Sequence, residues 1–105
     1  METIQLARYF ADFLNKYGAE NTEIIEAKNN KMFEYIIVCS AENKLVAQTL
    51  LVDLLEYAKH EFRQINCGLE GYKKGEWIII DFGKLVVHIF LKDIRNKFSI
   101  EKLWK

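Results

Sequence analysis

Apolar residues near the start of the chain recur at the spacing of an amphipathic α-helix. The residues of this stripe are Leu6, Phe10, Phe13, Leu14 and Tyr17. Gly18 follows directly and suits the end of a helix, because glycine adopts left-handed backbone conformations without steric cost. The pattern therefore predicts a first helix that ends before Gly18.

Two runs rich in β-forming residues come next, at residues 23–28 and 33–39. Asn29, Asn30 and Lys31 lie between the runs and form a short polar cluster of the kind that makes tight turns. We therefore expect the two runs to pair as antiparallel strands of a hairpin.

The clearest helical pattern in the chain covers residues 44–63. Its apolar stripe consists of Ala47, Leu50, Leu51, Leu54, Leu55, Ala58 and Phe62. Polar residues fill the opposite side, as in a helix that covers a core. Ser40 or Asn43 can cap its start.

Two further strands are predicted at residues 77–82 and 85–91, with Gly83 and Lys84 as a two-residue hairpin loop. Alternation along these strands separates two faces. One face is wholly apolar and comprises Ile78, Ile80, Phe82, Leu85, Val87 and Ile89. The other face mixes large aromatic with polar residues and comprises Trp77, Ile79, Asp81, Val86, His88 and Phe90. Because two polar groups are not expected in a buried core, the mixed face is a candidate partner surface.

Near the end of the chain, residues 93–97 are predicted to form a turn or a short helix. We expect the tail that follows to dock on the domain. The tail is expected to dock because it is rich in apolar and aromatic residues, which are Phe98, Ile100, Leu103 and Trp104.

Composition indicates a single domain without a strongly charged partner surface. The chain has 105 residues, half of them hydrophobic, and 15 Lys and Arg balance 15 Asp and Glu. Nonspecific nucleic-acid binding usually shows as a basic excess, so any contact with RNA should be peripheral. No apolar run is long enough for a membrane span, and the start of the chain lacks a signal-peptide core. We therefore expect a cytoplasmic protein.

Residues capable of catalysis or metal binding are few and scattered. Cys39 and Cys67 lie in separate segments, which argues against a zinc site or a disulfide framework. His88 has no second ligand at metal spacing, and we expect it to bond Asp81 or the backbone. His60 lies on the polar side of the long helix and is expected to be solvated. We expect no cofactor and no bound metal.

The last third of the chain carries a patterned set of residues, which are Glu70, Gly71, Trp77, Asp81, Phe82, Gly83, Val86, Val87, His88, Ile100, Glu101, Leu103 and Trp104. This set resembles the carboxy-terminal signature of the RsfS (Iojap-like) family of ribosomal silencing factors. A second, weaker match covers residues 33–48. The chain departs from the family pattern at Phe33, Ala41, Lys84 and the pair Lys44 and Leu45. The resemblance covers nearly the whole chain, with its weight at residues 70–104.

The resemblance implies an α/β fold, with a mixed β-sheet packed by helices in a nucleotidyltransferase-like topology. It also implies a protein without enzymatic activity that docks on ribosomal protein L14 of the large subunit and sterically blocks joining of the small subunit. Trp77 is the expected anchor, since a few aromatic residues usually dominate binding energy. The expected surround consists of Asp81, Phe82, Lys84, His88, Phe90 and Phe98.

Alternatives to this interpretation remain open from the sequence. Aromatic strand residues are more often core than interface, so Trp77 and Phe90 could serve packing alone. An enzyme of nucleotidyltransferase type would need paired carboxylates for magnesium, but the chain has no Asp-x-Asp. A third candidate is a homodimeric adaptor whose mixed sheet face binds itself or another protein.

Overall fold

Helices and strands follow the order that the hydrophobic pattern predicts, with one additional short strand. The computed structural model describes residues 1–64 and 66–98, except for the side chain of Phe98. The elements are α1 (Thr3–Lys16), β1 (Glu20–Glu26), β2 (Tyr35–Ala41), α2 (Lys44–Phe62), β3 (Gly68–Glu70), β4 (Trp77–Asp81), β5 (Leu85–Leu91) and α3 (Lys92–Phe98). The expected apolar tail at Ile100, Leu103 and Trp104 lies outside the described residues.

Local polar contacts fix the ends of the two long helices. The backbone N–H of Glu2 donates to Gln5 Oε1 at 3.0 Å at the start of α1. Asn43 caps α2 by accepting from the backbone N–H of Val46 at 3.0 Å, so of the two predicted caps Asn43 is the one used. Arg63 ends α2 in a left-handed conformation with φ of 55°.

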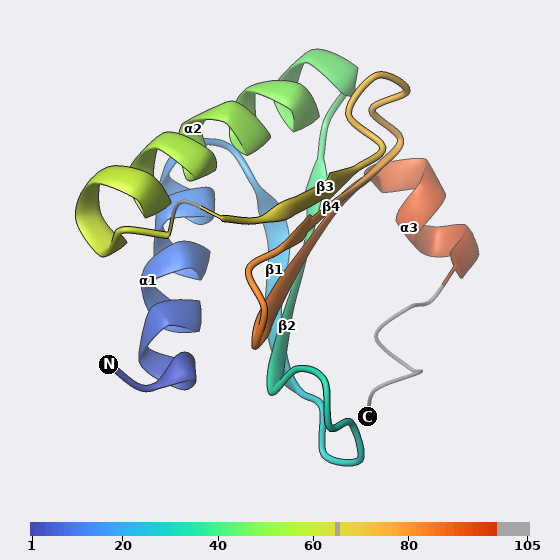
Figure 1. The fold of residues 1–105 in the computed structure, drawn as a ribbon. Coiled ribbons are helices and arrows are strands. Elements are labelled where there is room, and N and C mark those ends of the chain that lie inside the picture. The colour runs from blue at the N-terminus through green and yellow to red at the C-terminus, as the bar shows by residue number, and fades with distance from the viewer. Residues whose placement is uncertain (65, 99–105) are drawn as a thin grey trace.

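The sheet has five strands in the order β1-β2-β5-β4-β3. β1 pairs with β2, β4 with β5 and β3 with β4 in antiparallel fashion, which confirms both predicted hairpins. β2 and β5 run parallel, and α2, β3 and β4 lie between them along the chain. Helices α1 and α2 lie on one side of the sheet and α3 lies on the other (Figure 1).

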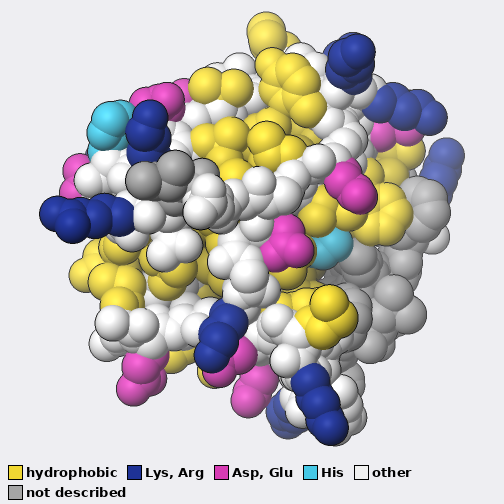
Figure 2. Space-filling model, in the orientation of Figure 1, with side chains coloured by type: hydrophobic (Ala, Val, Ile, Leu, Met, Phe, Trp, Pro, Cys, Tyr) yellow, Lys and Arg dark blue, Asp and Glu magenta, His cyan; other side chains and the backbone are white. Residues whose placement is uncertain are grey.

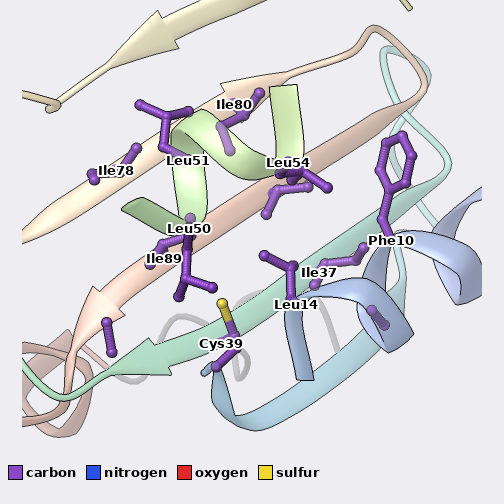
Figure 3. Close-up of a cluster of buried hydrophobic side chains, with 14 of the residues drawn as sticks. Phe10, Leu14, Ile37, Cys39, Leu50, Leu51, Leu54, Ile78, Ile80 and Ile89 are labelled. Atoms are coloured by element: carbon purple, nitrogen blue, oxygen red, sulfur yellow. The ribbon is translucent and has the colours of Figure 1, made fainter. Parts of the chain in front are cut away.

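The main core lies between the sheet and the helices α1 and α2. Side chains from both helices point toward the apolar sheet face that the alternation predicts (Figure 3). Phe10, Leu14, Leu50 and Leu54 are at most 1% exposed, and Ile80 is fully buried beneath them. Burial of such a side chain contributes roughly 1.5–3 kcal/mol, so this interface is the main source of stability.

The opposite sheet face is only partly open, and this differs from the sequence prediction. A second cluster of buried side chains forms there from Ile25, Ile36, Val38 and Phe90. On β5, His88 is 8% exposed and Phe90 is fully buried, so the expectation that β5 presents an open mixed face is wrong. The reason is that β5 is a central strand, flanked by β2 and β4, and α3 packs over β5 and β2. On β4 the same face stays accessible, with Trp77 and Ile79 half-buried and Asp81 exposed.

Candidate partner-binding surface

Trp77 begins β4 and lies at the open margin of the second cluster. Its register partner on β5 is Phe90, and the two rings stack with centroids 4.8 Å apart at an interplanar angle of 28°. Phe90 is fully buried and therefore supports the indole from below. Cross-strand aromatic pairs of this kind restrict side-chain rotamers, so Trp77 is held in a defined orientation while part of it remains exposed.

A hydrogen bond fixes the second edge of the Trp77 ring. The indole Nε1–H donates to Nδ1 of His88 at 2.9 Å. The sequence analysis predicted that His88 bonds Asp81 or the backbone. In the structure its partner is Trp77, so the prediction missed this hydrogen bond. Burial lowers the pKa of His88 from 6.5 to about 4, so the ring is neutral at pH 7 and Nδ1 is available as an acceptor.

The remaining predicted residues gather at the β4–β5 turn, at the other end of β4. Asp81 accepts a hydrogen bond from the backbone N–H of Gly83 at 2.7 Å, which stabilises the turn. Gly83 has φ of 96°, as the predicted glycine-first loop requires. Asp81 and Lys84 are exposed. Asp81 lies four residues along β4 from Trp77, roughly 13 Å at the rise of a strand.

Two of the predicted residues do not join the accessible part of this surface. Phe82 lies toward the main core, where its ring centroid is 5.1 Å from that of Phe10 on α1. Phe90 is buried and cannot reach a partner in this conformation. The side chain of Phe98 lies outside the described residues. The structure therefore brings Trp77, His88 and Phe90 together and separates them from Asp81, Phe82 and Lys84.

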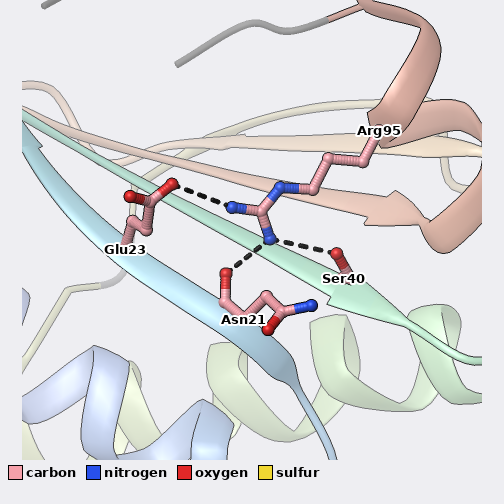
Figure 4. A network of polar contacts seen from close by, with 4 residues as sticks. All are labelled: Asn21, Glu23, Ser40 and Arg95. Atoms are coloured by element: carbon pink, nitrogen blue, oxygen red, sulfur yellow. Dashed lines mark hydrogen bonds and ion pairs between the residues drawn. The ribbon is translucent and has the colours of Figure 1, made fainter.

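A polar network that the sequence analysis missed holds α3 against the sheet beside this surface. The guanidinium of Arg95 donates to the backbone oxygen of Asn21, to Ser40 Oγ at 3.0 Å and to Glu23 Oε2 at 3.1 Å (Figure 4). Arg95 is 9% exposed and Ser40 2%. Buried charge is tolerated because several acceptors surround it. No local motif marks this contact, since Arg95 and Glu23 are far apart in sequence.

Lys92 adds a second link between α3 and the rest of the domain. Its ammonium lies 3.0 Å from Glu20 of β1 and 2.6 Å from Glu42 in the turn before α2. Ile94 on the same helix packs against the cluster that contains Phe90 and Trp77. The position of α3 therefore determines how far the second sheet face is covered.

Thiols and potential metal ligands are dispersed over the described part of the chain. Within residues 1–64 and 66–98, no three His, Cys, Asp or Glu side chains lie close enough to hold a metal ion. Burial raises the pKa of Cys39 to about 12 and also raises that of Cys67, so both thiols are protonated at pH 7. None of the helices in this part of the chain is long and apolar enough to cross a bilayer.

Comparisons of this chain with a family model and with individual proteins agree on one family. The family described as "RsfS: Ribosomal silencing factor during starvation" matches residues 1–105. The chain is 31% identical over 107 residues to the ribosomal silencing factor RsfS of Halalkalibacterium halodurans, covering 98% of this chain and 86% of that protein. It is also 28% identical over 57 residues to the mouse mitochondrial assembly of ribosomal large subunit protein 1, covering 49% of this chain and 25% of that one.

The fold itself recurs in a solved structure. A crystal structure of a protein from Chromobacterium violaceum superposes with a TM-score of 0.91 at 24% sequence identity, covering 99% of this chain and 87% of that one. At this identity the likeness concerns the arrangement of helices and strands.

Proposed function

Because the chain belongs to the RsfS family of ribosomal silencing factors, we propose that it binds the large ribosomal subunit and represses translation by keeping the small subunit from joining. The family match over the whole chain carries this proposal. The mouse relative, whose name refers to assembly of the large ribosomal subunit, supports the choice of that subunit. Ribosomal protein L14 is the proposed contact on it.

The proposed mechanism is steric. The domain measures 33 × 31 × 22 Å, so a copy bound at the face where the subunits meet would occupy space that the small subunit needs. Such a mechanism requires affinity and a rigid body but no reacting group.

Trp77 is the proposed anchor of the contact. An anchor gains affinity when its orientation is fixed before binding, because less conformational entropy is then lost. The stacking on Phe90 and the hydrogen bond to His88 provide that fixation. Asp81 and Lys84 are exposed and, at the far end of β4, could add charged contacts at the rim.

Binding of purified protein to isolated large subunits tests the proposal. Replacing Trp77 by Ala should weaken binding by about 30-fold or more, since a central aromatic anchor contributes roughly 2 kcal/mol or more. Ile25→Val is the matched control, because it loosens the same buried cluster on β1, which β2 and β5 separate from the strand of Trp77. It should lower stability by roughly 1 kcal/mol and leave the affinity nearly unchanged.

The two variants separate binding from folding. If affinity falls equally in both, Trp77 acts through stability and the anchor is elsewhere. If the wild-type protein fails to bind large subunits and instead forms a stable dimer by mass measurement, the homodimeric adaptor is the better account.

A further inference from the structure

A second candidate surface lies between α1 and α2, on the side of the sheet opposite Trp77. Tyr9, Phe13 and Tyr17 recur every four residues along α1 and form an aromatic stripe. The facing side of α2 carries Asp53, Tyr57 and Glu61 at the same spacing. A hollow of about 380 Å³ opens where the two stripes meet. We call this hollow and the stripes beside it the α1–α2 groove.

The walls of the α1–α2 groove are aromatic and rigid. The rings of Phe13 and Tyr57 stack with centroids 4.3 Å apart at 12°, which locks the two helices together. Tyr17 continues the row, 4.6 Å from Phe13, and is 51% exposed. The ammonium of Lys16 lies over this exposed ring, so a cationic ligand would take the place of Lys16 there.

The rim of the groove is acidic. Glu56 and Glu61 line the hollow together with Asp53, and the one histidine among the lining residues, His60, lies 3.1 Å from Glu56. Among the described residues, no Lys or Arg nitrogen lies within 4.0 Å of the carboxylates of Asp53 or Glu61. Figure 2 shows acidic side chains and a histidine, with basic ones beside them, over the carboxyl-terminal part of α2.

One carboxylate of the rim, Glu61, also acts on the aromatic wall. Burial first, and then the charges of Glu61, Tyr9 and Asp12, raise the pKa of Tyr57. A cation already takes up such a position within the chain, since the ammonium of Lys16 lies 5.7 Å from the centroid of the Tyr17 ring. Electron-rich ring faces beside carboxylates favour guanidinium and ammonium groups.

We propose that the α1–α2 groove binds an arginine- or lysine-rich segment of a partner protein. The stripes run for eight residues, about 12 Å along each helix, which is enough for cations at two or three positions of such a segment. An anionic polymer such as RNA is disfavoured by the carboxylate rim. Because the groove and Trp77 lie on opposite sides of the sheet, both can be occupied at once, and this inference does not depend on the proposed function.

The inference can be tested by titrating the full chain with an arginine–alanine repeat peptide. Nuclear magnetic resonance of the aromatic side chains monitors the titration. The ring signals of Tyr17 and Tyr57 should shift more than those of Tyr72, which is exposed elsewhere. The double variant Glu56→Gln and Glu61→Gln should bind about fivefold more weakly at low salt. Tyr17→Ala should bind about threefold more weakly.

A charge-matched control decides between a site and general attraction. The double variant Glu26→Gln and Glu70→Gln changes the net charge equally but alters exposed positions on β1 and β3. It should keep the wild-type affinity. Equal weakening of peptide binding in both double variants would overturn the inference. So would Tyr17 and Tyr57 signals that do not move when the peptide is at saturation. A single-stranded oligonucleotide that binds the groove more tightly than the peptide would also overturn it.

Discussion

Protonation of His88 should destabilise the domain and release the Trp77 ring. In the folded protein, Nδ1 of His88 accepts the indole N–H of Trp77, and a proton on that nitrogen abolishes the hydrogen bond. The charged ring would also be buried, since His88 is only 8% exposed. Both effects favour the neutral ring in the folded state, in agreement with a pKa lowered to about 4.

The size and direction of the effect follow from this pKa. Between pH 6.5 and about 4 the unfolded chain binds a proton at this position that the folded protein does not. Stability is therefore full above pH 6.5 and declines as the pH falls through this window. The complete loss is about 3 kcal/mol, and about 2 kcal/mol of it falls between pH 7 and pH 5.

Urea denaturation at pH 7, 6 and 5 measures this effect. His88→Asn is the test variant, because Asn Oδ1 stands in the place of Nδ1 and accepts a hydrogen bond but does not titrate. Its stability at pH 7 should be lower, since the smaller side chain packs less well, but it should lose about 2 kcal/mol less than the wild type between pH 7 and pH 5.

The result that would refute this reasoning is a pH dependence that is the same in the wild type and in His88→Asn. The acid sensitivity would then come from carboxylates, and neutral His88 would not be what holds Trp77. The indole N–H resonance of Trp77 provides a second readout, because it should move as His88 titrates and stay fixed in His88→Asn.

The Arg95 network and two glycines give further predictions. Arg95→Met should lower the free energy of unfolding by about 2 kcal/mol, because Ser40 and the half-buried carboxylate of Glu23 lose their donor. Arg95→Lys should recover part of this free energy. Urea denaturation measures both effects. Gly71→Ala should cost more than Gly83→Ala. Both glycines have positive φ, but a Cβ at Gly71 would lie 2.0 Å from the Trp77 carbonyl oxygen, whereas at Gly83 it would meet nothing within 4 Å. Gly71→Ala should therefore also weaken large-subunit binding, and equal stability of the two variants would contradict this account.

Local pattern was sufficient for the helices and the hairpins of this fold. The apolar stripes of α1 and α2 and the loop at Gly83 are short-range signals, and the structure confirms each of them. β3 escaped prediction as a strand because it has only three residues and exists through its pairing with β4.

The candidate surface was predicted less completely, because burial on a sheet depends on contacts distant in sequence. The alternation around His88 suggested an open face, but β5 pairs with β2 across the α2 crossover and is covered by α3. The run from Leu85 to Leu91 is apolar at every position except His88, which is typical of a strand buried on both faces and was the available signal. Arg95 gave no such signal, since its acceptors come from β1 and β2.

The most direct test of the central claim is to measure the joining of purified ribosomal subunits by light scattering. Large subunits incubated with the protein should join small subunits to a smaller extent than untreated ones. Trp77→Ala should restore joining, whereas Ile25→Val should not. Full joining in the presence of large subunits that have the protein bound would contradict the account.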